Sequence, residues 1–150
     1  MAAMGIRYYA WPVPARLVPL ALDDPCPFHS EDPLADAWGP ADERPPMLYL
    51  DKAWSELQQL FGEARPAAHL VHGEVTHTYD GWIPFERALT VKQVAAIAAD
   101  LADYQPDDAE IAAAAWRFGE VSYVRQYLED ARTFTAKLAE AGHGLVYLIG

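Results

Sequence analysis

The 150-residue sequence contains a single cysteine, Cys26, so no disulfide can form within the chain. Chains without disulfides are typical of reducing compartments, and we therefore expect a cytoplasmic protein. The segment around Cys26, DPCPFHS, holds two prolines and nearby acids but no Lys or Arg that would stabilise a reactive thiolate. We expect no catalytic role for Cys26 and interpret it as a partly buried or incidental thiol.

Long uninterrupted hydrophobic runs are also missing. The apolar segment AWPVPARLVPLAL at 10–22 is broken by three prolines and an arginine, and it is too short to cross a bilayer. The same interruptions do not fit the hydrophobic core of a signal peptide. We expect a soluble protein that does not insert into a membrane.

Basic residues are scarce, because 11 Lys and Arg stand against 22 Asp and Glu, for a formal net charge of −11. Such a charge repels phosphate backbones and anionic lipids, which argues against nucleic-acid binding and membrane-surface binding. A solvated acidic surface is the simplest interpretation, and a basic protein partner is the specific alternative.

The short motifs of the common enzyme families are absent as well. The sequence has no G-x-x-x-x-G-K-[ST] or G-x-G-x-x-G phosphate loop, no G-x-S-x-G nucleophile elbow, and no H-E-x-x-H or C-x-x-C metal motif. We expect no cofactor, and the absence favours a binding protein over an enzyme.

What is present suffices for one folded domain over 1–150, since 52% of the residues are hydrophobic. β-Branched and aromatic residues at 5–11 and 144–149 predict strands at both ends, and these strands can pair in one sheet. Helical patterns dominate between them. We predict a single α+β domain, in which a small mixed or antiparallel sheet with the N- and C-terminal strands is covered by about four to five helices.

The segment 23–46 differs in composition from the rest. It holds seven acids, one base and six of the 12 prolines, which predicts an irregular acidic loop. Within it, PLADAWG at 33–39 predicts one helical turn that pins Leu34 and Trp38 to the body.

The C-terminal half carries clearer helix signals. Thr90 precedes an apolar pattern and is followed three residues later by Gln93, which predicts a capping box. A second helix is expected from Asp107 to about Phe118, and a third over 121–141, ended by Gly142.

The stretch LYLDKAWSELQQLFG at 48–62 joins a short strand to a helix expected from about Lys52 to Phe61. Trp54 begins its apolar face. Asp51 suits the N-cap position, where its carboxylate would accept amide hydrogens of the first turn. Lys52 is disfavoured there by the helix dipole, so we consider it a candidate for ligand binding.

Further candidates lie in 66–89, where EVTHTY predicts a strand and Asp80-Gly81 a turn. Arg87, beside aromatic residues, can clamp a carboxylate or phosphate, or simply pair with Glu86, Asp51 or the C-terminus of a helix. His77 is a candidate for the same pocket. The spacing of His69, His72 and His77 does not give a four-ligand zinc site, so we predict no metal.

Several segments together resemble a known family: MGIRYYAWPV, LYLDKAW, RALT opening the VKQVAAIAADL helix, and the terminal GLVYLI. In this order they resemble the YfbM-like family of small bacterial proteins of unknown function. The resemblance implies a single α+β domain and brings no established activity, substrate or catalytic residue. The acidic segment 23–46 departs from the family's compact pattern.

Two functional hypotheses follow. The first is a small non-enzymatic binding or protein-interaction domain, whose partner is a protein, with a basic protein as the specific expectation. The second is a small-ligand-binding protein or enzyme with a pocket built from five residues: Asp51, Lys52, Trp54, His77 and Arg87.

Overall fold

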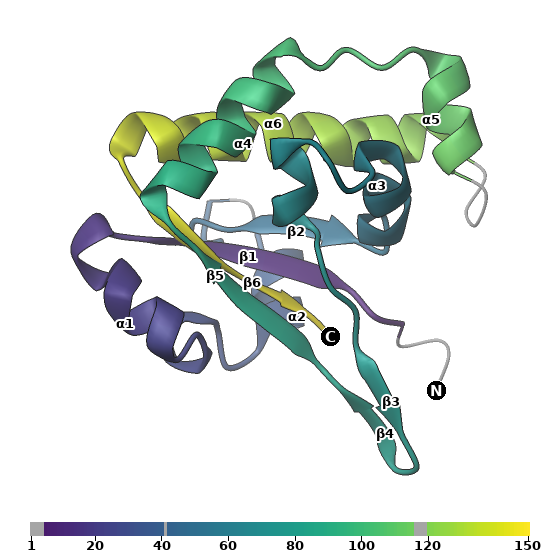
Figure 1. The fold of residues 1–150 in the computed structure, drawn as a ribbon. Helices are drawn as coiled ribbons and strands as arrows, with labels where there is room; N and C mark the ends of the chain where they lie inside the picture. Colours follow the sequence, from purple (N-terminus) through teal and green to yellow (C-terminus); the bar gives the residue numbers. More distant parts are fainter. Residues whose placement is uncertain (1–4, 41, 116–119) are drawn as a thin grey trace.

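A computed structural model describes residues 5–40, 42–115 and 120–150 of the chain (Figure 1). Four strands form an antiparallel sheet in the order β2-β1-β6-β5. Their bounds are β1 (Tyr8–Val13), β2 (Leu48–Asp51), β5 (Phe85–Leu89) and β6 (Gly144–Ile149). The N- and C-terminal strands are therefore neighbours at the centre of the sheet, as predicted.

Six α-helices and three short 3-10 helices occur in the described parts of the chain. The α-helices are α1 (Val18–Asp23), α2 (Pro33–Trp38), α3 (Trp54–Phe61), α4 (Val91–Asp103), α5 (Asp108–Ala114) and α6 (Val121–Ala141). The 3-10 helices are η1 (Ala15–Leu17), η2 (Cys26–Phe28) and η3 (Pro66–Leu70). None of the helices among these residues is long and apolar enough to cross a membrane. The prediction of an α+β domain is confirmed.

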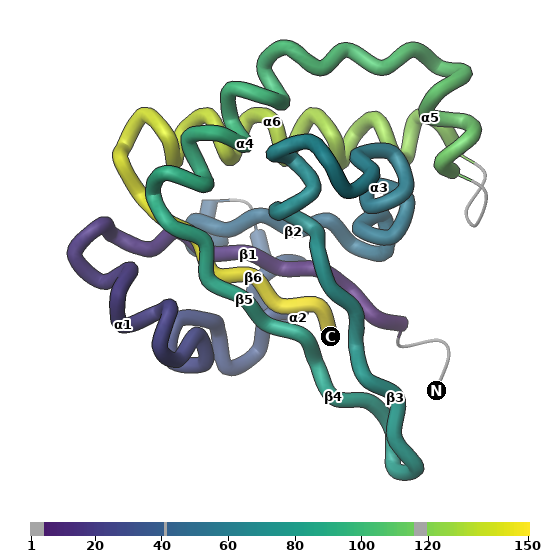
Figure 2. The backbone as a smooth tube through the Cα atoms, viewed as in Figure 1, coloured from purple at the N-terminus to yellow at the C-terminus, as the bar shows by residue number. Residues whose placement is uncertain are grey.

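The sheet separates two apolar clusters. Helices α3 to α6 cover one face, and α1 and α2 cover the other (Figures 1 and 2). Alternate residues of each strand enter opposite clusters, as the period of a β-strand requires. Tyr8 and Ala10 of β1 belong to the first cluster, whereas Tyr9 and Trp11 belong to the second.

A separate two-stranded hairpin projects from the body (Figures 1 and 2). It consists of β3 (Thr76–Thr78) and β4 (Gly81–Ile83), which pair antiparallel across a turn at 79–80. All six strand residues are exposed. The strand predicted in EVTHTY is confirmed as β3, whereas the turn lies one residue before the predicted Asp80-Gly81.

Two buried tyrosines hold the segment that leads into this hairpin. Tyr8 and Tyr147 stack with ring centroids 5.2 Å apart. The Tyr8 hydroxyl donates to the Leu70 carbonyl at 2.8 Å, and the Tyr147 hydroxyl donates to the His72 carbonyl. Gln58 adds a hydrogen bond to the Gly73 carbonyl at 2.6 Å. These contacts fix the path of residues 70–73 against the sheet.

The start and end of the first strand differ from the prediction. β1 begins at Tyr8 and continues through Pro12, which pairs with Leu145 of β6. Pairing with β2 stops at Ala10. Beyond that point one side of β1 has no strand partner, so the missing N–H of proline breaks no strand ladder there.

The acidic segment contains the helical turn predicted at 33–39, as α2, and also the 3-10 helix η2, which was not predicted. The prediction that both Leu34 and Trp38 are pinned to the body is wrong for Trp38, whose side chain is 65% exposed. Leu34 packs against the second apolar cluster. The indole of Trp38 lies instead beneath the Arg7 guanidinium, 5.6 Å from it.

The predicted helix ends in the C-terminal half are confirmed where they can be compared. Both hydrogen bonds of the Thr90–Gln93 capping box form, and α6 ends at Gly142 in the left-handed conformation, with φ +70°. The expected end of the second helix near Phe118 lies outside the described residues.

The ion pair between Arg65 and Asp100 ties η3 to α4. The guanidinium donates two hydrogen bonds to the carboxylate, at 3.0 and 3.1 Å, and the Ala67 amide donates a third at 2.9 Å. Burial by itself would raise the pKa of Asp100, but the bonds from Arg65 and Ala67 outweigh it and hold that pKa below its ordinary value.

Replacing Asp100 by Asn is therefore expected to lower the free energy of unfolding by about 1–3 kcal/mol at neutral pH. Since the pKa of Asp100 is lowered in the folded state, the wild-type advantage is present above about pH 4 and shrinks as the pH falls through the folded pKa. Urea unfolding at a series of acidic pH values measures this difference in unfolding free energy between wild type and Asp100→Asn. The surface pair Glu129–Arg132 serves as the control, because Glu129→Gln should cost less than about 0.5 kcal/mol. Equal losses in both variants would contradict the assignment.

Candidate functional site

Asp51 lies at the end of β2 and is the only non-glycine residue of the described chain with a positive φ, +50°. Aspartate tolerates this left-handed conformation better than most residues. Its carboxylate accepts three hydrogen bonds, from Arg7 Nε at 3.2 Å, the Tyr49 hydroxyl at 2.9 Å and the Tyr123 hydroxyl at 2.8 Å. Asp51 thus joins β2 to the residue before β1 and to α6.

The predicted N-cap role of Asp51 is wrong. Helix α3 begins at Trp54, its N-cap is Ala53, and no side chain caps it. The chain makes a turn first, in which the Ala53 amide donates to the Leu50 carbonyl at 2.9 Å. The carboxylate is consequently directed to tertiary partners and not to the first turn of the helix.

The two tyrosines of this network remain hydrogen-bond donors at neutral pH. Burial raises the pKa of Tyr49 and of Tyr123, and the hydrogen bonds that they donate to Asp51 raise both further. The arrangement fixes an edge of the sheet.

Lys52 and Trp54 support the segment at Gly5 and Ile6. The Lys52 amide donates to the Tyr123 hydroxyl at 3.2 Å, and the Trp54 indole donates to the Ile6 carbonyl at 2.9 Å. The Lys52 side chain lies so close to Gly5 that a Cβ at that position would collide with it. Gly5 has φ +62°, so glycine suits both the backbone and the close approach of Lys52.

His77 lies across a groove from this segment. The groove has a volume of about 450 Å³ and is lined by Gly5, Ile6, His77, Thr78, Tyr79, Gly81 and Trp82. Its walls are the inner side of the hairpin and the chain entering β1. Lys52 and Trp54 therefore stand behind one wall, and His77 belongs to the other.

Arg87 is placed elsewhere. It lies on β5, at the opposite edge of the sheet from β2, with β1 and β6 between them. Its guanidinium approaches the His69 ring at 3.2 Å and the His69 carbonyl at 3.5 Å, so neither Glu86 nor Asp51 is its partner. Of the five predicted residues, only His77 lines the groove, and Lys52 and Trp54 contact the segment at Gly5 and Ile6 that forms its other wall. Asp51 is held in its own network, and Arg87 lies apart from the other four residues.

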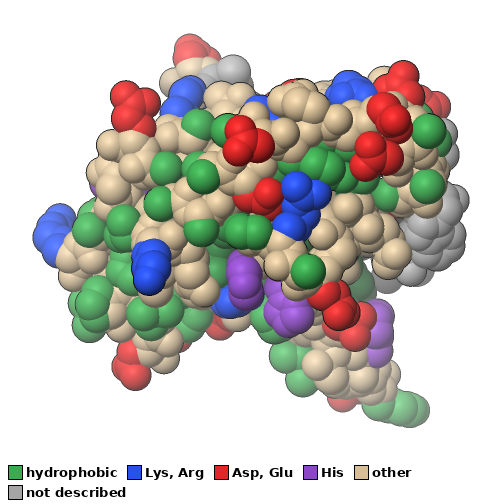
Figure 3. All heavy atoms as spheres, turned by 45° about the horizontal axis from the view of Figure 1, so that its top comes forward, with side chains coloured by type: hydrophobic (Ala, Val, Ile, Leu, Met, Phe, Trp, Pro, Cys, Tyr) green, Lys and Arg blue, Asp and Glu red, His purple; other side chains and the backbone are tan. Residues whose placement is uncertain are grey.

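Histidine side chains gather where the helical layer meets the hairpin (Figure 3). They do not form a metal-ligand cluster among the described residues. Three metal-ligand atoms come together at one place in the described chain, at Cys26, His29 and Glu86. The sequence signal for this group is the Cys-x-x-His spacing in CPFH, but Glu86 is distant in the sequence and only the fold reveals it.

A larger cavity of about 620 Å³, not expected from the sequence, lies between the α2–β2 segment and α6. It is lined mainly by Ala37, Trp38, Arg44, Met47, Leu48, Tyr49, Gln126, Tyr127, Asp130, Thr133, Phe134 and Lys137. Burial, followed by the neighbouring charge of Glu129, raises the pKa of Asp130. Aromatic walls with a few charged groups are typical of small-molecule sites.

The Asp51 network gives a direct test. Replacing Asp51 by Ala removes the acceptor shared by three donors and places alanine, which tolerates a positive φ less well than aspartate, at this position, so we expect a loss of about 2–4 kcal/mol of unfolding free energy. Asp51→Asn keeps one acceptor oxygen and tolerates the same φ, and it should lose clearly less. Chemical denaturation measures both variants, and equal stability of Asp51→Ala and wild type would contradict the network.

Comparison with known proteins adds one finding. The model of a family described as a domain of unknown function (DUF1877) matches residues 28–148, which include the hairpin and Asp51 with its partners Tyr49 and Tyr123, but neither Arg7 nor Cys26. Comparisons with curated proteins and with solved structures gave no match. With most of its length matched, the chain belongs to the DUF1877 family of domains of unknown function.

Proposed function

We propose that the protein is a non-catalytic protein-interaction domain, and that it binds its partner through the hairpin β3–β4 and the adjoining groove. One observation carries the proposal. The hairpin projects from the body with every strand residue exposed, and it presents three large apolar side chains to solvent: Tyr79, Trp82 and Ile83.

The projecting hairpin, called the arm from here on, has little stability of its own but exposes residues that are suited to binding another protein. A two-stranded hairpin without a packed face is only marginally stable in water. Tyr and Trp are the residues that most often carry binding energy at protein interfaces. The groove beside the arm can receive an apolar side chain of a partner, while the arm contacts the partner's surface.

Charge favours a basic partner. The stretch 73–83, which contains the hairpin, holds two acids, Glu74 and Asp80, and no Lys or Arg. The net charge of −11 makes contact with a second copy of the chain electrostatically unfavourable. A protein partner with a basic rim around an apolar anchor would complement both features, in the cytoplasm that the single cysteine suggests.

Site-specific photo-crosslinking in cells that produce the full chain tests the proposal. A photo-reactive phenylalanine analogue at position 79 should give crosslinks to a specific protein, and mapped peptides should be rich in Lys and Arg. The same analogue at Leu20, which is 61% exposed on α1, is the matched control and should give none of these products.

Two further variants sharpen the result. Trp82→Ser with Ile83→Thr should abolish the crosslink from position 79, and Asp80→Lys should weaken it. Products at position 20 identical to those at position 79, or no product at position 79, would contradict the proposal. Crosslinks from position 79 to the chain itself would replace it by self-association.

Small-ligand binding is the second candidate function. The 620 Å³ cavity beside α6 is a better candidate for the ligand site than the five-residue pocket expected from the sequence. Its aromatic walls and two cations, Arg44 and Lys137, suit an aromatic anion. Thermal-shift screening with aromatic carboxylates should reveal a stabilising ligand whose effect Lys137→Gln weakens. An effect unchanged by Lys137→Gln, or no stabilising carboxylate, would argue against this candidate.

A further inference from the structure

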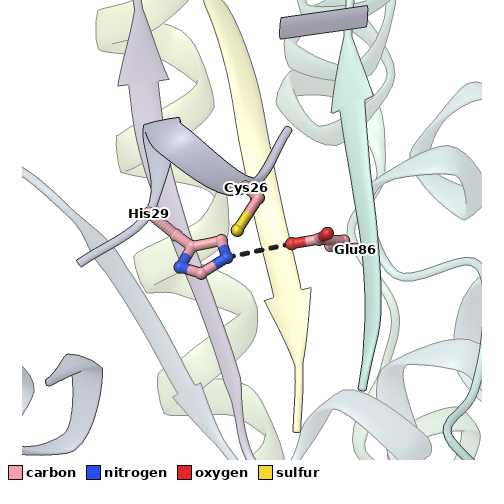
Figure 4. Close-up of side chains that lie close together, drawn as sticks. All are labelled: Cys26, His29 and Glu86. Atoms are coloured by element: carbon pink, nitrogen blue, oxygen red, sulfur yellow. Dashed lines mark hydrogen bonds and ion pairs between the residues drawn. The ribbon is translucent and has the colours of Figure 1, made fainter. Parts of the chain in front are cut away.

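The side chains of Cys26, His29 and Glu86 converge on one point at the surface of the sheet (Figure 4). One donor atom from each lies within 4.8 Å of the others. Cys26 is exposed on η2, while His29 and Glu86 are half-buried. We propose that these residues form a binding site for a divalent transition metal of the zinc class.

The hydrogen bonds of His29 orient its ring for this role. Nδ1 lies 3.3 Å from the Ser30 carbonyl oxygen, and Nε2 lies 2.9 Å from Glu86 Oε2. A backbone carbonyl at Nδ1 holds the proton on that nitrogen and leaves Nε2 for the metal. This is the usual arrangement around a metal-binding histidine.

The placement of the sulfur separates a metal site from a nucleophile triad. In a triad, the nucleophile and the carboxylate would face opposite nitrogens of the imidazole. Here the Cys26 sulfur lies beside the same ring edge that bonds to Glu86 (Figure 4). All three donors therefore surround a single position, which an ion can occupy.

The donor set and the charge suit zinc. One thiolate, one imidazole and one carboxylate are ligands of Zn²⁺, and three protein ligands leave a fourth position for water. The cation, the thiolate and the carboxylate sum to zero charge, with the thiol proton and any Nε2 proton released to solvent. Tetrahedral ligands stand about 3.5 Å apart, so the three donors need to move by only about an ångström.

The backbone around Cys26 favours this small movement of the three donors toward one another. Pro25 and Pro27 restrict the chain on both sides of Cys26, and Asp24 accepts a hydrogen bond from the Cys26 amide at 3.2 Å. The His29 ring packs beside Trp11, with centroids 5.8 Å apart. A bound ion would link η2 to β5, and its fourth position would face the exposed side of Cys26.

Titration of chelator-treated full-length protein with Zn²⁺ and with Co²⁺ tests the site. Wild type should bind one equivalent of either ion, and the Co²⁺ form should show thiolate-to-metal charge-transfer absorption. Cys26→Ser should lose that absorption, and Glu86→Gln and His29→Gln should each weaken binding about tenfold or more. His72→Gln, an exposed histidine outside the cluster, is the control and should bind like wild type.

Thermal unfolding checks that none of the variants has lost its fold. All four variants should melt like wild type without metal, and Zn²⁺ should raise the melting temperature of wild type and His72→Gln but not of Cys26→Ser. Failure of wild type to bind one equivalent, or equal binding by Cys26→Ser, would overturn the proposal. The metal site is independent of the hairpin, so neither result bears on the proposed protein partner.

Discussion

Two tyrosine hydroxyls in the core constrain the path of the chain that leads into the hairpin. A hydroxyl removed from water must find a hydrogen-bond partner, because an unpaired one costs about 1–3 kcal/mol. Tyr8 and Tyr147 stand on the two central strands, and their acceptors are the carbonyls of Leu70 and His72. A segment that pairs with no strand is thereby fixed to the middle of the sheet.

The hairpin depends on this attachment. Its first strand follows the fixed segment after Gly73, whose φ is +118° and where a Cβ would collide with the Phe85 ring. Its second strand continues into β5, where Phe85 packs near Tyr147 with centroids 6.1 Å apart. Both ends of the arm are therefore held by the core, although the arm itself has no packed face. This combination suits an arm that presents apolar side chains to a partner.

The structural features that could be predicted from the sequence are those that depend on residues close together along the chain. The capping box at Thr90 and the end of α6 at Gly142 are signals within a few residues, and the structure confirms them. The same local reasoning failed at Asp51, because its partners Arg7 and Tyr123 are 44 and 72 residues away. A strong local preference for the N-cap gave way to tertiary hydrogen bonds.

The candidate sites likewise could be predicted only where they depend on residues close together in the sequence. His77 and the turn could be placed from the sequence, but the projection of the hairpin could not, since it depends on the attachment of residues 70–73. Likewise Cys26 and His29 are neighbours in the sequence, whereas Glu86 reaches them only because β5 passes beneath η2, 57 residues away from His29.

The central claim is that the hairpin is a preformed arm held rigidly at its base, and backbone ¹⁵N relaxation of residues 73–86 tests it most directly. The account predicts order parameters of about 0.85 through both strands, close to those of the four-stranded sheet. Values below about 0.6 in β3 and β4 would show an arm that moves independently of the body, and would contradict the claim.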